Sequence, residues 1–341
     1  MKKLFIISNE SVYDYENSFF CDNIDMKSTP EGLKNKFDIS IIARKSKIKR
    51  THKINVQKID IFKNIFSYLF RIYKSLSHQN SKYLIISISP FTFLACILLF
   101  FFKKKPLVYL RSDGFEEYKS ILGVIGPAIY YFMFTVTSKI SNFIGCREYI
   151  LRGVKGKIVN PSQIDNIWLS NTKKPSLDKL RLLYVGRVRI EKGVYSLLKI
   201  LKNNVHEDII LSIVGAEKKE IKEIIQKNVN VYKIEEVKEN LINYYDDHNV
   251  FILPSFTEGH PLVLLESLAR LRPVIIFDEI NYIVNNYQGI FVAKRNFVDF
   301  FKKINYIKNN YDIIQEKMKT NKIPTRNDFL KKLEKIIIEH K

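Results

Sequence analysis

Hydrophobic runs alternate with amphipathic segments along the first half of the chain. Short apolar runs stand at 3–8, 38–43, 83–89 and 106–112, and the segment 90–105 begins with a proline and ends in lysines. Short continuous apolar runs are typical of strands buried on both faces, and a segment that opens with proline and closes with lysine is typical of a helix. Strand, helix and strand in this order predict a parallel α/β sheet.

The same alternation begins again in the second half, after a segment rich in Pro, Ser and Asn at 159–180 that has the composition of a linker. A chain of 341 residues, 46% of them hydrophobic, is long and apolar enough for two packed domains. We expect a first α/β domain at 1–165, a second at 166–324, and a C-terminal helix at 325–341 that packs back on the first domain.

Three segments of the first half bear on membranes. Apolar residues at helical spacing with interleaved cations predict a basic amphipathic helix at 61–76, which either covers the sheet or contacts a membrane. The segments 83–102 and 121–137 carry no charge, but Pro90 interrupts the first and Gly126-Pro127 the second. We therefore predict a strand followed by a helix in the first, and a buried or interfacial helix in the second.

The formal charge of +21 is concentrated in the first domain, where residues 39–112 hold fifteen Lys or Arg and a single acid, Asp60. Such a balance indicates either nucleic acid or an anionic membrane surface as a partner. The three cysteines are far apart and form no CxxC or Cys/His pattern, so neither a disulfide framework nor a zinc site is predicted. This cysteine usage fits a reducing cytoplasm.

The stretch "EGHPLVLLE" sets Glu258 in a loop after an apolar run and Glu266 on the second turn of the helix that follows. We expect Pro261 at the first helical position, with the amides of Leu262 and Val263 forming a phosphate site at the helix start. Carboxylates on either side of a phosphate suit the hydroxyl groups of a nucleotide sugar. A capped helix with a solvated glutamate is the alternative.

A second stretch, "YVGRVRIEKG", predicts a strand, a tight turn at Gly186 and a helix beyond Gly193. Arg187 and Lys192 follow the end of the strand. Two such cations clamp a diphosphate and stabilise its charge as it leaves. Taken singly, each is an ordinary surface cation.

Together these two stretches resemble the GT-B glycosyltransferases of the large retaining family with the E-x7-E motif (family 4, group 1 type), over residues 180–280. The resemblance implies two Rossmann-like domains facing a cleft. It implies that Arg187 and Lys192 hold the donor diphosphate, that Glu258 binds the donor sugar, and that Glu266 binds the ribose. Donor contacts are also implied for Gly186, Gly259, His260, Pro261, Leu262 and Val263.

The segment around Glu235 to Val237 would lie near the base of the nucleotide. The chain has Leu271 where the family usually has glycine, and no glycine-rich loop follows its first strand. No D-x-D triplet occurs, so we expect neither a metal nor another cofactor. In the first domain Asp113 follows the predicted strand at 106–112 and Arg111 lies near its end; both are candidates for contacts on the acceptor side. A plain strand-end turn is the alternative for them.

The sequence therefore predicts a retaining glycosyltransferase that moves a sugar from a nucleotide diphosphate sugar to a saccharide or lipid-linked acceptor in bacterial surface glycan assembly: capsule, O-antigen or lipopolysaccharide. It is expected in the cytoplasm, peripheral on the inner face of the cytoplasmic membrane, with anionic lipid and not nucleic acid as its partner. The rival hypothesis is a basic nucleic-acid-binding protein without enzymatic activity. Phosphorylase-like or epimerase-like use of the same fold is a minor alternative.

Overall fold

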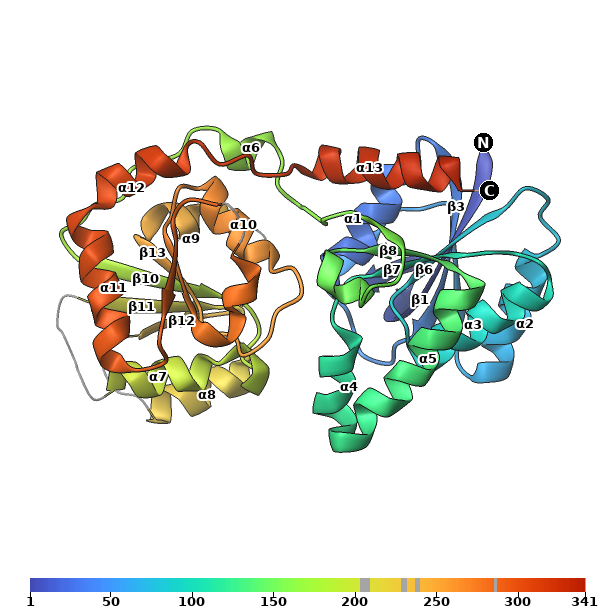
Figure 1. The fold of residues 1–341 in the computed structure, drawn as a ribbon, viewed down its shortest axis with the longest axis horizontal. Helices are drawn as coiled ribbons and strands as arrows, with labels where there is room; N and C mark the ends of the chain where they lie inside the picture. The colour runs from blue at the N-terminus through green and yellow to red at the C-terminus, as the bar shows by residue number, and fades with distance from the viewer. Residues whose placement is uncertain (203–208, 228–231, 237–239, 285–286, 341) are drawn as a thin grey trace. The chain divides into compact units, whose positions relative to one another are not determined.

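The computed structural model describes residues 1–202, 209–227, 232–236, 240–284 and 287–340. Its chain forms two compact units, unit 1 from Met1–Gln163 with Arg326–Lys341, and unit 2 from Ile164–Thr325 (Figure 1). These limits lie within two residues of the expected ones, at 165/166 and 324/325. The C-terminal helix therefore belongs to unit 1.

Unit 1 is built on a mostly parallel sheet with buried strands. The strand β1 lies in the middle, with β3 and β6 beside it. Continuous burial of Leu4 to Ile7 explains why this run has no polar alternation. The parallel strands lie in the order β5 (Lys58–Phe62), β3 (Phe37–Lys45), β1 (Lys2–Tyr15), β6 (Lys82–Ile86), β7 (Leu107–Leu110), β8 (Asn142–Gly145) and β9 (Gly156–Ile158).

An antiparallel extension stands where the resemblance stated above implies a glycine-rich loop. The strand β1 runs on to Tyr15 and turns through Glu16 and Asn17, whose φ angles are 48° and 58°. Two consecutive positive φ angles make the tight turn that suits the twist of a hairpin. Beyond this turn β2 (Ser18–Cys21) pairs with β1, and β4 (His52–Ile54) pairs with β2.

The helix expected at 61–76 is shorter than predicted. Ile61 and Phe62 belong to β5, where they pair with β3. Helix α2 (Ile65–Ser75) begins only after Asn64, whose side chain accepts a hydrogen bond from the Ser67 amide in a capping box. The expected start was wrong because the apolar spacing of the strand happened to continue that of the helix, whereas the cap fixes where the helix begins.

The helices of unit 1 cover both faces of its sheet. Helix α3 packs against α2 and α5, and α13 packs against α1. In Figure 1 helices α2, α3 and α5 lie on one side of the strands, away from α1 and α13. The helices are α1 (Ile24–Leu33), α2, α3 (Pro90–Phe101), α4 (Gly114–Leu122), α5 (Gly126–Ile140) and α13 (Arg326–Glu339), with short 3₁₀ helices η1 (Gly123–Ile125) and η2 (Glu148–Leu151).

Unit 2 is a Rossmann-like domain, and the strand pairs described for its sheet are all parallel. The strands lie in the order β12 (Tyr232–Glu235), β11 (Ile209–Val214), β10 (Leu180–Val185), β13 (Val250–Leu253), β14 (Val274–Phe277) and β15 (Ile290–Ala293). The order reverses between β10 and β13, which is the switch point of a doubly wound fold.

The described helices of unit 2 are α6 (Asn166–Leu169), α7 (Val194–Lys202), α8 (Lys218–Lys227), α9 (Ile242–Asp247), α10 (Leu262–Ala269), α11 (Phe297–Asn309) and α12 (Tyr311–Met318), with η3 (Ile190–Lys192) and η4 (Asp278–Ile283). Helix α10 ends in a Schellman motif, because the Arg272 amide donates to Ser267 O and the Leu271 amide to Leu268 O. Leu271 has φ 56°, the conformation in which glycine is usual. The backbone thus keeps the glycine-type helix end with a leucine in place.

Candidate functional site

The candidate site lies in unit 2 at the switch point between β10 and β13. These two strands are hydrogen-bonded neighbours, and their carboxyl ends are at Val185 and Leu253. Two of the predicted residues, Gly186 and Arg187, directly follow the first strand, and Glu258 follows the second by five positions. In open α/β sheets ligands bind at this edge, because the loops diverge on either side of the reversal.

An ion pair joins the two predicted motifs. The Lys192 ammonium lies 2.6 Å from Glu258 Oε1, and the Ser255 hydroxyl donates to the same oxygen at 2.6 Å. The side chains of Lys192 and Glu258 are 26% and 9% exposed. The Glu258 carboxylate therefore accepts hydrogen bonds from two donors. The Lys192 ammonium has three hydrogens and donates one of these to Glu258.

Gly193 allows the two loops to approach this closely. Its φ is 67°, and a Cβ atom at this position would lie 1.9 Å from the carbonyl oxygen of Pro254. A second contact fastens the same loops, because the Phe256 amide donates to Glu191 O at 2.9 Å. A side chain at position 193 would push the loops apart and move Lys192 away from Glu258.

Arg187 directly follows Gly186 at the end of β10, and its side chain is exposed. Its backbone carbonyl accepts a hydrogen bond from the Tyr184 hydroxyl at 2.8 Å. Burial raises the pKa of Tyr184, the Glu258 carboxylate raises it further, and the Arg187 guanidinium opposes both. The cation and the carboxylate thus both lie close to one buried phenol. Within the described part of the chain no acidic side chain comes within 4.0 Å of Arg187, so it is available to an anion.

The loop 258–261 leads into α10, which begins at Leu262. Pro261 is the N-cap and not the first helical residue, so the expected start was one position early, because ψ of 111° keeps this proline extended. No side chain caps this end among the described residues. The amides of Leu262 and Val263 belong to its first turn, where the helix dipole favours an anion.

The Glu266 carboxyl group accepts a hydrogen bond from a buried tyrosine. The Tyr245 hydroxyl donates to Glu266 Oε2 at 2.9 Å and lies 3.3 Å from Val263 O. Burial raises the pKa of the Glu266 carboxyl to about 7, and the bond from Tyr245 works against that rise. The side chain still has partial access to solvent, so it can accept hydrogen bonds from a ligand once it is ionised.

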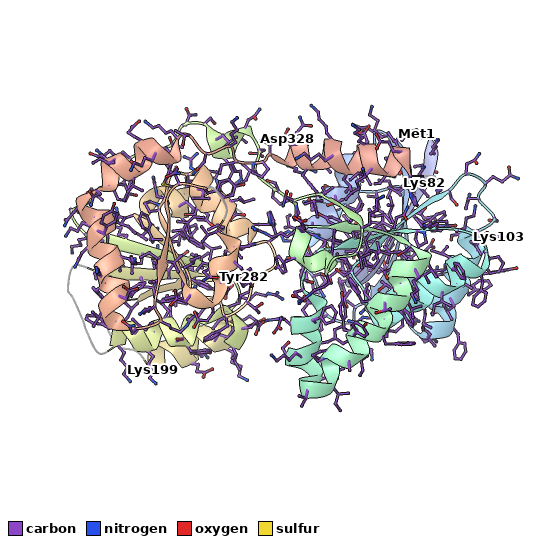
Figure 2. All side chains as sticks on the ribbon, viewed as in Figure 1. Met1, Lys82, Lys103, Lys199, Tyr282 and Asp328 are labelled. Atoms are coloured by element: carbon purple, nitrogen blue, oxygen red, sulfur yellow. The ribbon has the colours of Figure 1, made fainter. Side chains whose placement is uncertain are left out.

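The sequence analysis missed two residues that hold this loop. The hydroxyl of Tyr282, labelled in Figure 2, accepts from the Glu258 amide at 2.9 Å and donates to Glu258 O at 2.8 Å. The Arg295 guanidinium lies 4.2 Å from the ring centroid of Phe256 and also donates to Ser255 O. Both residues follow the carboxyl end of a parallel strand, which is the signal that would have found them.

The two acceptor candidates have partners within unit 1. Arg111 forms a buried ion pair with Asp25, and burial lowers its pKa to about 10. Asp113 caps α4 by accepting from the Phe115 amide, and its carboxylate lies 2.7 Å from Arg152. These bonds fit the strand-end alternative. Of the other expected donor contacts, Gly259 and His260 lie partly buried on the loop before α10, and Val237 lies outside the described residues.

Comparison with known proteins finds sequences that are similar to this region. Residues 166–323 match the family model "Glycosyl transferases group 1". The capsular polysaccharide biosynthesis glycosyltransferase CapM of Staphylococcus aureus is 31% identical over 147 residues, 40% of this chain and 38% of that protein. The amylovoran biosynthesis glycosyltransferase AmsD of Erwinia amylovora is 37% identical over 106 residues, 29% of each. The chain thus spans well under half of these relatives.

Among solved structures, Anabaena HepE in complex with UDP and glucose aligns with a TM-score of 0.73 and 10% identity, covering 99% of this chain and 100% of that one. At this identity the likeness shows the fold, which is the GT-B arrangement of two Rossmann-like domains. The match to the glycosyl transferases group 1 model spans residues 166–323 and so contains the whole candidate site.

Proposed function

We propose that the protein is a retaining glycosyltransferase that moves a sugar from a nucleotide diphosphate sugar to a saccharide or lipid-linked acceptor. The observation that carries the proposal is the Lys192–Glu258 pair at the switch point, within the region that matches the group 1 model. Arg187 follows the same strand end, and Glu266 lies on the helix that follows Glu258. Within this arrangement Lys192 and Arg187 contact the diphosphate, together with the first amides of α10. Glu258 binds the donor sugar, and Glu266 binds the ribose.

The chain's contribution to the reaction is electrostatic. The bond between the anomeric carbon and the diphosphate oxygen breaks, and both electrons leave with the diphosphate. Cations fixed beside those oxygens stabilise the growing charge without any metal. The acceptor oxygen attacks on the same face, its bond to the anomeric carbon forms, and its proton passes to the departing diphosphate. No protein base is then required, and no cofactor beyond the donor is proposed.

The place of this reaction is proposed as bacterial surface glycan assembly: capsule, O-antigen or lipopolysaccharide. The names of the two relatives, in capsular polysaccharide and amylovoran biosynthesis, support this class of product. We place the protein in the cytoplasm, peripheral on the inner face of the membrane. Its basic charge is assigned to lipid and not to nucleic acid, since the cations of 61–112 are interleaved with exposed aromatic side chains.

A donor screen tests the proposal. Each nucleotide diphosphate sugar is incubated with the protein, with and without oligosaccharide acceptors, and release of the nucleoside diphosphate is followed. We expect release with one donor class, no loss of turnover in EDTA, and the donor's anomeric configuration in the product by NMR. Absence of release with every donor, or turnover that EDTA abolishes and manganese restores, contradicts the proposed chemistry.

A further inference from the structure

Unit 1 exposes an unusual number of large apolar side chains on one group of neighbouring elements. Helix α3 packs against α2 and α5, and ring contacts join them, with Phe93–Phe132 centroids 5.8 Å apart and Tyr73–Phe102 centroids 5.6 Å apart. Helix α4 and η1 precede α5 and contact it. We call the exposed large apolar residues of α2, α4, η1, α5 and the end of α3 the apolar face: Phe66, Phe70, Tyr73, Phe100, Phe101, Phe102, Ile121, Leu122, Val124, Ile125, Ile129, Tyr131 and Phe132. Exposed apolar patches of this kind mark interaction sites.

The segment Gly114–Ile140 is apolar enough to cross a bilayer by length and composition: an 18-residue window within it has a mean hydropathy of 1.5, and 28% of that window is buried. It folds instead into a hairpin. The Tyr130 ring on α5 lies 4.8 Å from that of Phe115 and 5.2 Å from that of Tyr118 on α4. The two arms have 9 and 15 residues. At 1.5 Å per residue these arms reach only about 14 and 23 Å, less than the roughly 30 Å of a hydrocarbon core.

The turn of this hairpin is its most exposed part. At Gly126 a Cβ atom would lie 1.9 Å from Tyr118 O, so a glycine is what lets the arms fold back. The 3₁₀ helix η1 then presents Val124 at 94% and Ile125 at 66% exposure. A hairpin with an apolar tip is suited to entering the outer layer of a bilayer, and too short to cross it.

The charges around the apolar face are those that an anionic surface attracts. Residues 63–105 contain seven Lys or Arg and no Asp or Glu. Three of these cations, Lys103 to Lys105, directly follow the exposed Phe100 to Phe102, and Lys103 is labelled in Figure 2. The acidic residues of α4, Glu116 and Glu117, are in its first turn, at the opposite end from the tip. Aromatic rings beside lysines are typical of side chains at the level of lipid headgroups.

We propose that unit 1 docks on an anionic bilayer by inserting the hairpin tip, Ile121 to Ile125, while the aromatic side chains of α2 and the end of α3 lie at headgroup level with Lys103 to Lys105. This deepens the peripheral location proposed above, on which it rests. It depends on no step of sugar transfer, so vesicle binding and transfer are measured separately and can fail separately.

The first test removes the apolar tip. The protein is sedimented with vesicles of phosphatidylglycerol and phosphatidylcholine, at low and high salt. We expect the double variant Val124→Ser, Ile125→Ser to lower the partition constant about 10- to 100-fold. The matched control is Val298→Ser, Ile313→Ser on unit 2, whose wild-type side chains are 76% and 59% exposed, and it should bind as the wild type does. All four positions are exposed, and thermal unfolding checks that both variants stay folded.

The second test measures insertion directly. The three native cysteines, Cys21, Cys96 and Cys146, are buried, so an environment-sensitive fluorophore labels an introduced cysteine selectively. Vesicles should shift the emission of Val124→Cys to the blue and leave that of Ile313→Cys unchanged. Turnover with a soluble acceptor should survive in the serine variants, which separates loss of docking from loss of the proposed reaction.

Four outcomes overturn the proposal. Complete release of the wild type by high salt would mean that electrostatic attraction alone holds the protein on the vesicle, without insertion of the hairpin tip. Binding that resists alkaline carbonate and yields only to detergent indicates a spanning segment. An unshifted label at Val124, or equal losses in the control variant, places the contact elsewhere. Absence of vesicle binding, with dimers in the wild type that the tip variant loses, makes the apolar face a contact between copies of this chain.

Discussion

Replacement of Lys192 by methionine separates the two roles of its ammonium group. The methionine side chain has an unbranched apolar stem like that of lysine but lacks the terminal ammonium, so the 2.6 Å bond to Glu258 disappears while the stem stays. Ser255 still donates to the same carboxylate oxygen, at 2.6 Å, so Glu258 is not left without a donor. We therefore expect a small cost in folding and a large one in transfer.

The cost in folding follows from the partial exposure of Lys192, and the cost in transfer from its proposed contact with the leaving diphosphate. A charge-assisted hydrogen bond contributes about 1.5–3 kcal/mol, and the remaining Ser255 bond and the partial exposure of Lys192 reduce this to a loss of about 1 kcal/mol in unfolding free energy. Loss of a cation that stabilises a departing diphosphate costs about 2–4 kcal/mol, or roughly 30- to 1000-fold in kcat/KM.

The assay pairs urea unfolding with release of the nucleoside diphosphate. The control is Lys319→Met, because Lys319 also lies 2.6 Å from a glutamate, Glu316, but both side chains are more than half exposed. It should change neither stability nor kcat/KM by more than about 1 kcal/mol. Near-native turnover in Lys192→Met, with a defect only in stability, would refute the assignment of Lys192 to the diphosphate.

Three further predictions test other parts of unit 2. By calorimetry, Glu266→Ala should weaken binding of the free nucleotide while Glu258→Ala leaves it intact; equal losses contradict this division between ribose and sugar. Because burial raises the pKa of Glu266 to about 7 from 4.5, the folded chain keeps a proton that the unfolded chain has released between these pH values. The stability that this carboxyl contributes is thus full below about pH 4.5 and lost as the pH rises through 7. We expect Glu266→Gln, which cannot ionise, to gain unfolding free energy over the wild type between about pH 5 and 8. A difference in unfolding free energy, measured in urea, that stays constant over this pH range would disprove the effect. Leu271→Gly relieves about 1 kcal/mol of left-handed strain while losing a partly buried side chain, so its unfolding free energy should stay within about 1 kcal/mol of the wild type, whereas Leu268→Ala should cost about 2–5. Equal losses would mean that packing of Leu271 outweighs its backbone strain.

The sequence by itself determined the elements and the positions of the motifs. Burial on both faces makes a parallel strand continuously apolar, so the runs at 3–8 and 250–255 were recognisable without any knowledge of their neighbours. A glycine turn followed by a cation, and a proline before an apolar helix, are local signals too. For this reason Gly186 and Arg187 were placed at the end of a strand and Glu258 in the loop after another, and the structure has them there.

Tertiary structure alone decided which of these residues meet. Lys192 and Glu258 are 66 residues apart, and their bond depends on the pairing of β10 with β13 and on the close approach at Gly193. Local spacing could not show that Arg111 is engaged by Asp25, 86 residues away. It also could not show that 114–140 folds back on itself. Side-chain periodicity reports the environment of one segment, whereas the pairing of strands and the packing of helix arms depend on contacts between segments that the sequence keeps far apart.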